Sequence, residues 1–365
     1  MISPRQPNIL TVFTGGTISS RNAGHSVEMS GAPYRLIDAV PADEFHFEAI
    51  EPLHTLSENM TPGMLFDLFT GIAAACSKNH YDGLIIAHGT DTLAYTAQIA
   101  ALLLDSLGIP SVILGSKLPL DDPKSDGQAN FIHALELIRQ LDSGVYVTSR
   151  TCDGIDCVHF ASKIMQADSQ TDDFQSYRGQ IAGTMQEGTF IPGPAFPAAK
   201  ARPALTGSAL AGPAVPAPSE AGCAAVPEAR SQDRLSRLAV LGHLPDKETV
   251  LMLDACVGTD YRALDMTRRE FDYILQRLYH SGTACTAPGS SPYSLLYLQE
   301  LCRTNGKRLF IAPVEKNRTP YSTTLELLEA GITPVYDRPA EAVWAGLLLC
   351  TWLKEKPEEL FHSAG

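Results

Sequence analysis

Two short turns, rich in threonine and glycine, carry the side chains of this sequence that are best suited to chemistry. They are Thr14-Gly15-Gly16-Thr17 and His88-Gly89-Thr90-Asp91-Thr92, and they follow the apolar runs 9–13 and 84–87. Buried parallel strands end at one edge of an open α/β sheet, where ligands bind, so we expect both turns at that edge. Two clusters of hydroxyl groups and one carboxylate there favour a threonine nucleophile.

Each turn also has an interpretation without catalysis. The first lacks the lysine of a P-loop and the spacing of a dinucleotide fingerprint, so alone it fits a structural turn or a phosphate cradle as well. In the second, Asp91 beside Thr90 suits ammonium binding and proton relay, but the same carboxylate suits a helix cap. His88, directly before that turn, is predicted to be structural.

A threonine nucleophile needs a base, and Lys163 is the candidate. Threonine is a weak nucleophile unless a neighbouring group removes its proton, and a lysine can do so where burial and nearby charge lower its pKa. Lys163 follows the predicted strand 144–149 after a short connection that can return it to the same sheet edge. The spacing alone fits a solvent-exposed lysine as well.

The elements that must position these residues alternate between strand and helix in the first half of the chain. The predicted strands are 9–13, 83–87, 111–114 and 144–149. Thr61-Pro62 predicts the start of one helix, and Ser125-Asp126 predicts the cap of another. This alternation predicts an α/β fold, with a larger N-terminal domain, 1–191, built on a doubly wound, mostly parallel sheet.

Residues 192–245 have a different character. Up to Glu228 the stretch is rich in proline and alanine and has no periodic apolar pattern, which predicts an extended linker between domains. Residues 246–365 are predicted to form a smaller C-terminal α/β domain. Its predicted elements are strands at 249–253 and 308–312, a helix face at Leu275 and Leu278, and helices at 325–329 and 340–352.

The composition excludes some classes of partner. The net charge of −13 argues against nucleic acid or an anionic membrane. The eight cysteines are scattered without zinc spacing, which favours reduced thiols in the cytoplasm. The start of the sequence has no signal-peptide pattern, and no apolar run reaches the length of a membrane span. We therefore expect a cytoplasmic protein.

Taken together, the motifs resemble the bacterial-type L-asparaginase family over most of the chain. The two threonine turns, extended by Ile18 and Leu93, match the first and second motifs of that family. Residues 56–62 resemble its substrate-binding turn. The stretch after its third strand is matched by Pro119, Ser125-Asp126-Gly127 and Asn130.

The resemblance implies hydrolysis of the side-chain amide of L-asparagine to aspartate and ammonia, with no metal or organic cofactor. It implies that Thr14 attacks the amide carbon, and that Thr90 and Asp91 form a relay with Lys163 as base. Backbone N–H groups near Thr90 would stabilise the oxyanion. The residues that would bind the substrate are Ser57, Glu58, Thr90 and Asp91. A homodimer or homotetramer is also implied.

Three departures from the family keep other functions open. The loop 19–31 has no tyrosine where many relatives use one to activate the first threonine, and the sequence selects neither His25 nor Tyr34 in its place. Glu58 stands where relatives often have Gln or Ser, and its charge would repel a substrate carboxylate. The stretches 288–291 and 321–324 lack a clear Asn or Glu, which relatives supply across a subunit interface.

Two alternatives follow from these departures. Glu58 favours an amidase for another small amide, such as a substituted or D-amino amide. The missing tyrosine favours a non-catalytic homologue that binds amino acids. A transamidase subunit acting with tRNA is disfavoured, because the sequence shows no additional amino-terminal domain and no basic face.

Overall fold

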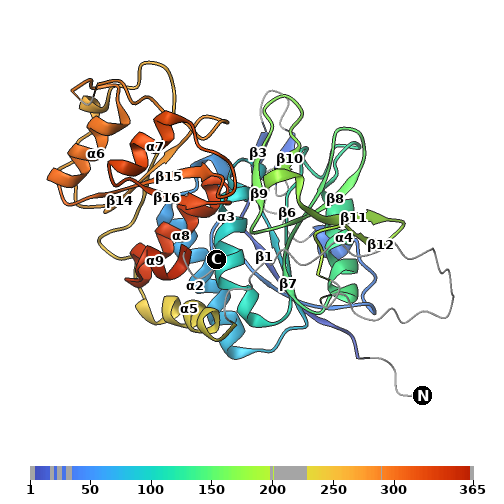
Figure 1. Ribbon diagram of the computed structural model, residues 1–365. Coiled ribbons are helices and arrows are strands. Elements are labelled where there is room, and N and C mark those ends of the chain that lie inside the picture. Colours follow the sequence, from blue (N-terminus) through green and yellow to red (C-terminus); the bar gives the residue numbers. More distant parts are fainter. Residues whose placement is uncertain are drawn as a thin grey trace.

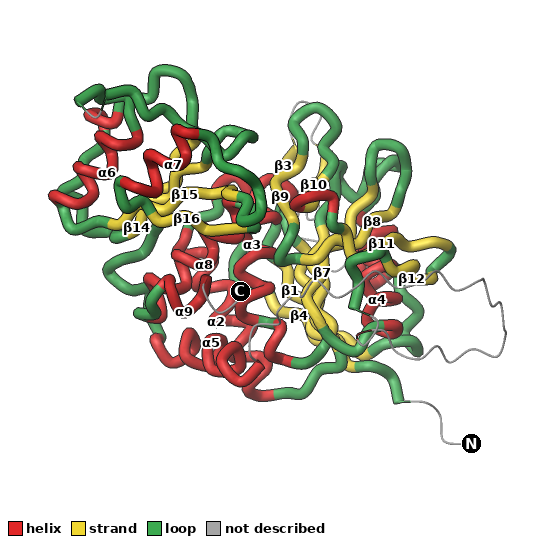
Figure 2. The backbone as a smooth tube through the Cα atoms, viewed as in Figure 1, coloured by secondary structure: helices red, strands yellow, loops and turns green. Residues whose placement is uncertain are grey.

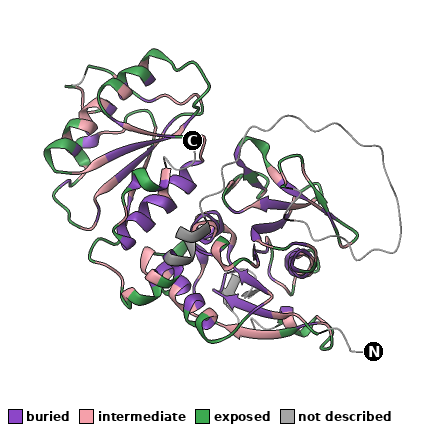
Figure 3. Ribbon diagram, turned by 60° about the horizontal axis from the view of Figure 1, so that its bottom comes forward, coloured by how far each residue is buried: buried purple, intermediate pink, exposed green. Residues whose placement is uncertain are grey.

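The computed structural model describes residues 5–16, 20–22, 27–29, 35–197, 200, 228–288 and 290–361. They form two α/β parts, one on an eight-stranded sheet and one on a four-stranded sheet (Figure 1). Strands and inner helix faces are buried, whereas loops and outer helix faces are exposed (Figure 3). The predicted fold class, a larger mostly parallel α/β part and a smaller α/β part, is confirmed.

The large sheet has the strand order β12-β11-β8-β7-β6-β5-β1-β4. Five neighbouring strands are parallel: β4 (His46–Ile50), β1 (Asn8–Phe13), β5 (Gly83–Ala87), β6 (Pro110–Leu114) and β7 (Gly144–Arg150). Three antiparallel strands extend the sheet: β8 (Asp156–Phe160), β11 (Ile181–Gln186) and β12 (Thr189–Pro192). All four strands predicted in this half are present within two residues of their expected bounds.

Helices cover both faces of the parallel strands, which explains their continuous apolar runs. In β5, Leu84 and Ile86 belong to one buried cluster, while Ile85 and Ala87 belong to the cluster on the other face. The helices of this part are α1 (Arg35–Asp38), α2 (Pro62–Lys78), α3 (Thr90–Leu103) and α4 (Gly127–Gln140). The predicted start of α2 is confirmed, since Thr61 accepts a hydrogen bond from the Met64 N–H at 3.3 Å.

A hairpin lies beside α3. Its strands are β9 (Ile164–Ala167) and β10 (Phe174–Ser176), which are antiparallel. The side-chain amide of Gln98, two turns into α3, donates to the carbonyl of Ile164 at 2.7 Å. A second short hairpin consists of β2 (Ser20–Asn22) and β3 (Val27–Met29). Short 3-10 turns occur at Ser57–Asn59, Asp105–Leu107, Tyr177–Gly179 and Tyr261–Ala263.

The predicted linker 192–245 contains a folded helix at its carboxyl end. Helix α5 (Glu228–Leu241) packs beside α2 in Figure 2, and its Leu235 and Leu238 belong to the main buried cluster. Arg234 of the same helix is paired with Glu355 at 3.0 Å. Residues 201–227, which carry most of the proline and alanine, lie outside the described residues.

The small sheet is entirely parallel, in the order β13 (Leu251–Asp254), β14 (Tyr273–Arg277), β15 (Arg308–Val314) and β16 (Thr333–Tyr336). Its helices are α6 (Leu295–Thr304), α7 (Ser322–Glu329), α8 (Ala340–Leu353) and α9 (Pro357–Phe361). The predicted helix face at Leu275 and Leu278 is wrong. Leu275 lies inside β14, an inner strand whose Ile274 and Leu275 enter different clusters, so apolar residues on both faces imitated a helical spacing.

Candidate active site

The two threonine turns lie side by side, because β1 and β5 are neighbouring parallel strands. The backbone N–H and the hydroxyl of Thr14 both donate to the carbonyl of Ala87, each at 3.2 Å. Thr14 is only 1% exposed. Gly15 forms a bridge with Thr55, whose N–H donates to the Thr14 carbonyl at 3.0 Å. Thr14 is thus held between two other segments of the same sheet edge.

Close backbone contacts explain why glycines occupy these turns. Gly16 has a φ of 75°, and a Cβ atom there would lie 2.5 Å from the Cα of Gly89. A Cβ atom on Gly89 would lie 2.5 Å from Ser57 Oγ. Any larger residue at either position would separate the turns, so the glycines set the distance between the hydroxyl groups.

Ser57 and Asp91 are in direct contact, although 34 residues separate them in the chain. The buried Ser57 hydroxyl donates to Asp91 Oδ2 at 2.9 Å, and its oxygen accepts from the Asp91 N–H at 3.3 Å. Thr92 Oγ1 donates to the Ser57 carbonyl at 2.9 Å. Asp91 occupies the first turn of α3, where the helix dipole favours a carboxylate. Glu58, the next residue after Ser57, is exposed.

His88 supports the second turn from inside the protein. Its Nδ1 lies 2.7 Å from the carbonyl of Gly89 and its Nε2 lies 2.9 Å from the hydroxyl of Thr96. A carbonyl only accepts, so the proton is assigned to Nδ1. Burial lowers the pKa of His88 to about 4, and the imidazole is therefore neutral near pH 7. These contacts agree with the structural role that the sequence predicts for it.

The loop after β6 meets the second turn at Gly115, where a Cβ atom would lie 3.0 Å from Thr90 Cγ2. The buried carboxylate of Asp126 fixes this loop, accepting from the Ser116 hydroxyl at 3.0 Å and the Lys117 N–H at 2.9 Å. The predicted cap at Ser125-Asp126 is confirmed, since Asp126 is the N-cap residue of α4 and Ser125 Oγ accepts from the Gly127 N–H at 3.3 Å, although the Asp126 side chain makes no cap hydrogen bond. Its oxygens bind the β6 loop and Asn130 instead.

Lys163 lies in the connection between β8 and β9, at the start of the hairpin beside α3. Its N–H donates to the Phe160 carbonyl at 2.9 Å, and its carbonyl accepts from the Tyr177 N–H at 2.8 Å. Lys163 is held beside α3 through its neighbour Ile164, whose carbonyl accepts from Gln98.

Four of the predicted site residues lie together at the ends of β1 and β5. They are Thr14, Ser57, Thr90 and Asp91.

A second lysine, Lys117, follows the contact between Gly115 and Thr90 and was missed by the sequence interpretation. Its Nζ is 2.6 Å from Asp173 Oδ1. The available signal was its position, two residues after Gly115 at the end of a strand that was correctly predicted. The partner of Lys117 is 56 residues away, and nothing in the spacing indicated that contact.

Thr17, Ile18, His25 and Tyr34 lie outside the described residues, as does Gly289 in the stretch 288–291. The stretch 321–324 forms the start of α7. Among the described residues, no group of three or more His, Cys, Asp or Glu is arranged to hold a metal ion. No helix in the described part of the chain is long and apolar enough to cross a membrane.

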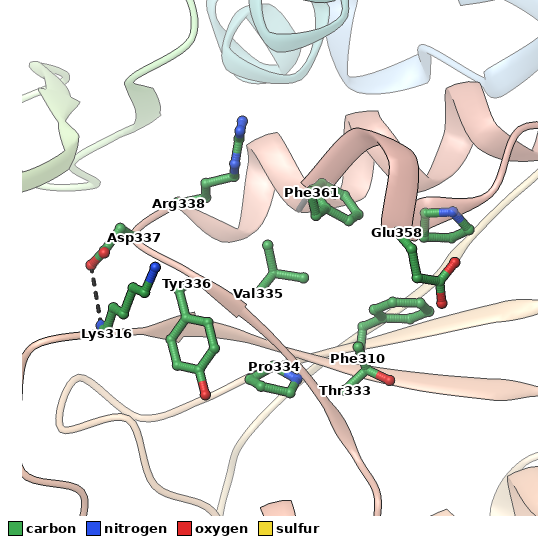
Figure 4. A pocket seen from close by; sticks show the side chains of 11 residues that line it. Phe310, Lys316, Thr333, Pro334, Val335, Tyr336, Asp337, Arg338, Glu358 and Phe361 are labelled. Carbon is green, nitrogen blue, oxygen red and sulfur yellow. Dashed lines mark hydrogen bonds between the residues drawn. The ribbon is translucent and has the colours of Figure 1, made fainter. Parts of the chain in front are cut away.

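Figure 4 shows a pocket of about 140 Å³ in the small part, between β15, β16 and α9. Its floor is apolar, with Phe310, Val335 and Phe361. Two carboxylates at its rim are engaged with other groups: Asp337 accepts from the backbone N–H of Lys316 at 3.4 Å, and Glu358 pairs with Arg308. It contains none of the predicted site residues, so the threonine edge remains the candidate site.

Comparisons with known proteins cover the large part best. The family model described as asparaginase, N-terminal, matches residues 8–191. L-asparaginase 1 of Escherichia coli strain K12 is 35% identical over 140 residues, which cover 36% of this chain and 40% of that protein. A glutamyl-tRNA(Gln) amidotransferase subunit of Methanococcus maripaludis is 32% identical over 182 residues, which cover 48% and 43%. The chain spans less than half the length of these curated relatives.

Solved structures match over nearly the whole chain. The thermostable L-asparaginase from Thermococcus kodakarensis has a TM-score of 0.67 at 21% identity, covering 98% of this chain and 96% of that chain. L-asparaginase I from Vibrio cholerae has a TM-score of 0.65 at 20% identity, with the same coverage of 98% and 96%. At these identities the likeness shows the fold, including the small part.

Proposed function

This chain belongs to the asparaginase family, and on that premise we propose that it is an amidohydrolase that releases ammonia from the side-chain amide of L-asparagine. The observation that carries the proposal is the meeting of Thr14, Ser57 and the Thr90-Asp91 pair at one sheet edge. A hydroxyl nucleophile, a second hydroxyl beside a carboxylate, and glycine-rich backbone suit acyl transfer from an amide.

In this proposal the substrate is held by charge and hydrogen bonds on the α3 side of the site. The Asp91 carboxylate attracts the substrate ammonium, and the Ser57 hydroxyl donates to the substrate carboxylate. Ser57 Oγ donates to Asp91 at 2.9 Å in the structure, so its hydroxyl must turn from Asp91 to the substrate carboxylate when the substrate binds. Thr90 and the exposed Glu58 complete the binding residues.

The chemistry proceeds in two halves. Thr14 Oγ1 attacks the amide carbon, and the oxyanion that forms accepts hydrogen bonds from backbone N–H groups near Thr90. The C–N bond then breaks, and the nitrogen leaves as ammonia after taking up a proton. In the second half, water attacks the ester on Thr14 and releases aspartate. The Thr90-Asp91 relay moves the protons, and Lys163 is the base that the family resemblance gives it.

The amidotransferase relatives favour a second candidate. By that likeness, this chain would be a subunit of an amidotransferase that acts on glutamyl-tRNA(Gln). The acidic net charge of −13 weakens this candidate, because an RNA contact needs a basic surface. A different small amide is a further possible substrate, because the charge of Glu58 would repel a substrate carboxylate.

Release of ammonia from a panel of amides tests the proposal. The purified chain should release ammonia from L-asparagine faster than from L-glutamine, D-asparagine or an N-substituted asparagine. Preference for another member of the panel would change the assigned substrate but not the type of reaction. If no amide is hydrolysed while aspartate still binds in calorimetry, the chain is an amino-acid-binding homologue and the proposal fails.

Assembly and location rest on different observations. We propose a homodimer or homotetramer, as the resemblance implies, and a cytoplasmic location, as the scattered cysteines favour. Light scattering on the purified chain tests the assembly directly. A mass of one chain at micromolar concentration would contradict it.

A further inference from the structure

A largely buried ion pair beside the threonine turns has no role in the chemistry described above. Lys117 Nζ lies 2.6 Å from Asp173 Oδ1, and their side chains are only 21% and 14% exposed. The same ammonium contacts the carbonyl of Thr171 at 3.4 Å. Removing two charges from water is costly, and a hydrophobic pair often serves stability as well. The pair therefore invites a functional explanation.

Lys117 belongs to a segment that is fixed against Thr90. Gly115 packs closely against Thr90, since a Cβ atom added to it would lie 3.0 Å from Thr90 Cγ2, and its carbonyl accepts from Asn130 Nδ2 at 3.0 Å. The Lys117 N–H is held by Asp126 at 2.9 Å. Two residues of chain span at most about 7 Å, so the backbone of Lys117 is tied closely to the Thr90 contact.

Asp173 is held in place independently of Lys117. The N–H of Cys152 donates to the same Oδ1 atom at 2.8 Å. Burial alone would raise the pKa of Asp173, but the hydrogen bonds from Lys117 and Cys152 outweigh it and lower that pKa. Asp173 closes the 168–173 tip of the β9–β10 hairpin, where its carbonyl accepts from the Asp168 N–H at 2.9 Å. The ion pair thus clamps the hairpin tip to the end of β6.

The same hairpin carries Lys163 at its base. Ile164, next to Lys163, is held by Gln98 of α3 at 2.7 Å. The carbonyl of Lys163 accepts from the Tyr177 N–H, directly after β10, at 2.8 Å. The antiparallel pairing of β9 with β10 joins this base to the clamped tip. The hairpin is therefore fixed at one end by α3 and at the other end by Lys117.

We propose that the ion pair between Lys117 and Asp173 is a positioning clamp that keeps Lys163 aligned with Thr90. This inference rests on the proposed function and names two further residues of the same site. One end of the clamp is tied to Thr90 through Gly115, and the other end belongs to the hairpin that presents the base. Lys117 and Asp173 are positioning residues, since they act through Lys163 and Thr90 and not on the substrate. Small errors in such an alignment slow proton transfer strongly.

Single variants give the first test. Lys117→Met should lower kcat for the preferred amide about tenfold to 100-fold and leave KM within about threefold, because substrate binding by Ser57 and Asp91 does not depend on the clamp. Lys117→Arg, which keeps the charge, should restore part of the rate. Lys247→Met is the control, because it removes an ion pair with Asp272 in the small part.

Combined variants separate a positioning role from a merely structural one. If the clamp acts through Lys163, then Lys117→Met should cost less than about twofold in a chain that already carries Lys163→Met. A structural defect elsewhere would instead multiply the two losses. Multiplied losses, or a Lys117→Met enzyme with an unchanged kcat, would overturn the inference.

Two further outcomes remain distinct. If Lys117→Met fails to fold, Asp173→Asn replaces it, with a smaller loss of kcat in the same direction. If the wild-type chain hydrolyses no amide, the proposed function is contradicted instead, and the clamp is tested by hydrogen exchange. Lys117→Met should speed backbone amide exchange at 168–173, whereas Lys247→Met should not. Equal exchange in the two variants would overturn the clamp.

Discussion

At the carboxyl edge of the large sheet, β1 and β5 end in glycine-rich turns that set Thr14 against Ala87 and bring Asp91 to Ser57. At the same edge of the small sheet, β13 and β14 end in charged residues. Arg277 pairs there with Asp254 at 3.3 Å and with Glu341 of α8 at 3.0 Å. It also reaches the Tyr95 hydroxyl of α3 at 3.5 Å.

The difference shows what a parallel sheet edge does and does not decide. Both edges offer strand ends and helix N-termini, which are the positions where ligands bind in open α/β sheets. One edge presents hydroxyl groups with small neighbours, whereas the other pairs its charges within the small part and reaches the large part at the Tyr95 hydroxyl. Position follows from topology, and chemistry follows from the side chains that end the strands.

The largest effect should follow from changes at the threonine edge. Thr14→Val and Thr90→Val should each lower kcat at least about 1000-fold, because they remove the proposed nucleophile and the proposed relay hydroxyl. Thr351→Val is the matched control, since Thr351 also donates to a backbone carbonyl, that of Leu347, but lies in α8. Steady-state ammonia release measures all three. Comparable losses in the control would contradict a catalytic role of the threonine edge.

At the small edge, a stability effect should replace the catalytic one. Arg277→Met leaves Glu341, only 3% exposed, without its partner, which should cost about 3 kcal/mol of unfolding free energy. Lys247→Met, at a pair that is half exposed, should cost less than about 1 kcal/mol. Urea denaturation gives both values. A destabilisation by Arg277→Met no larger than that of Lys247→Met would mean that the buried Glu341 does not depend on Arg277.

The neutral His88 makes the threonine edge sensitive to acid. Its pKa is about 4 in the folded chain and about 6.5 when unfolded. The unfolded state binds more protons in this window, so stability is full above pH 6.5 and falls as pH drops toward 4, by up to about 3 kcal/mol. His88→Asn should flatten that part of the curve of unfolding free energy against pH. A variant curve with the same slope as wild type would show that His88 does not contribute.

The smallest effect should come from Glu58. It is exposed, so its charge is screened by solvent, and Glu58→Gln should raise kcat/KM for L-asparagine only about two- to fivefold. The gain should shrink in high salt. A panel of amides with the variant shows whether preference moves toward L-asparagine. No change in preference would mean that Glu58 points away from the substrate.

Much of the fold was predictable because buried parallel strands are plain apolar runs, as in 83–87 and 144–149. The same continuity misled at Leu275, where an inner strand imitated a helix. Single-sequence patterns also missed α5. This helix is stabilised by packing against apolar residues of α2, and beside a proline-rich stretch its own sequence gives only a weak helical signal.

The candidate site was predictable only where motifs carried it. Thr14, Ser57 and Asp91 came from local motifs, and the structure brings them together. Asp126 binds the β6 loop through a contact with Lys117, 9 residues away in the sequence. Lys117 pairs with Asp173, 56 residues away. Ordinary residue types at such separations leave no pattern in one sequence, so these contacts are seen only in the folded structure.

The most direct test of the central claim is the covalent state of Thr14 during turnover. The chain is mixed with its preferred amide, quenched in acid within one turnover, and its peptides are weighed by mass spectrometry. We predict a mass increase of one acyl group on the peptide that contains Thr14, absent in Thr14→Val. An acyl group on the Thr90 peptide instead, or full turnover by Thr14→Val, would contradict the account.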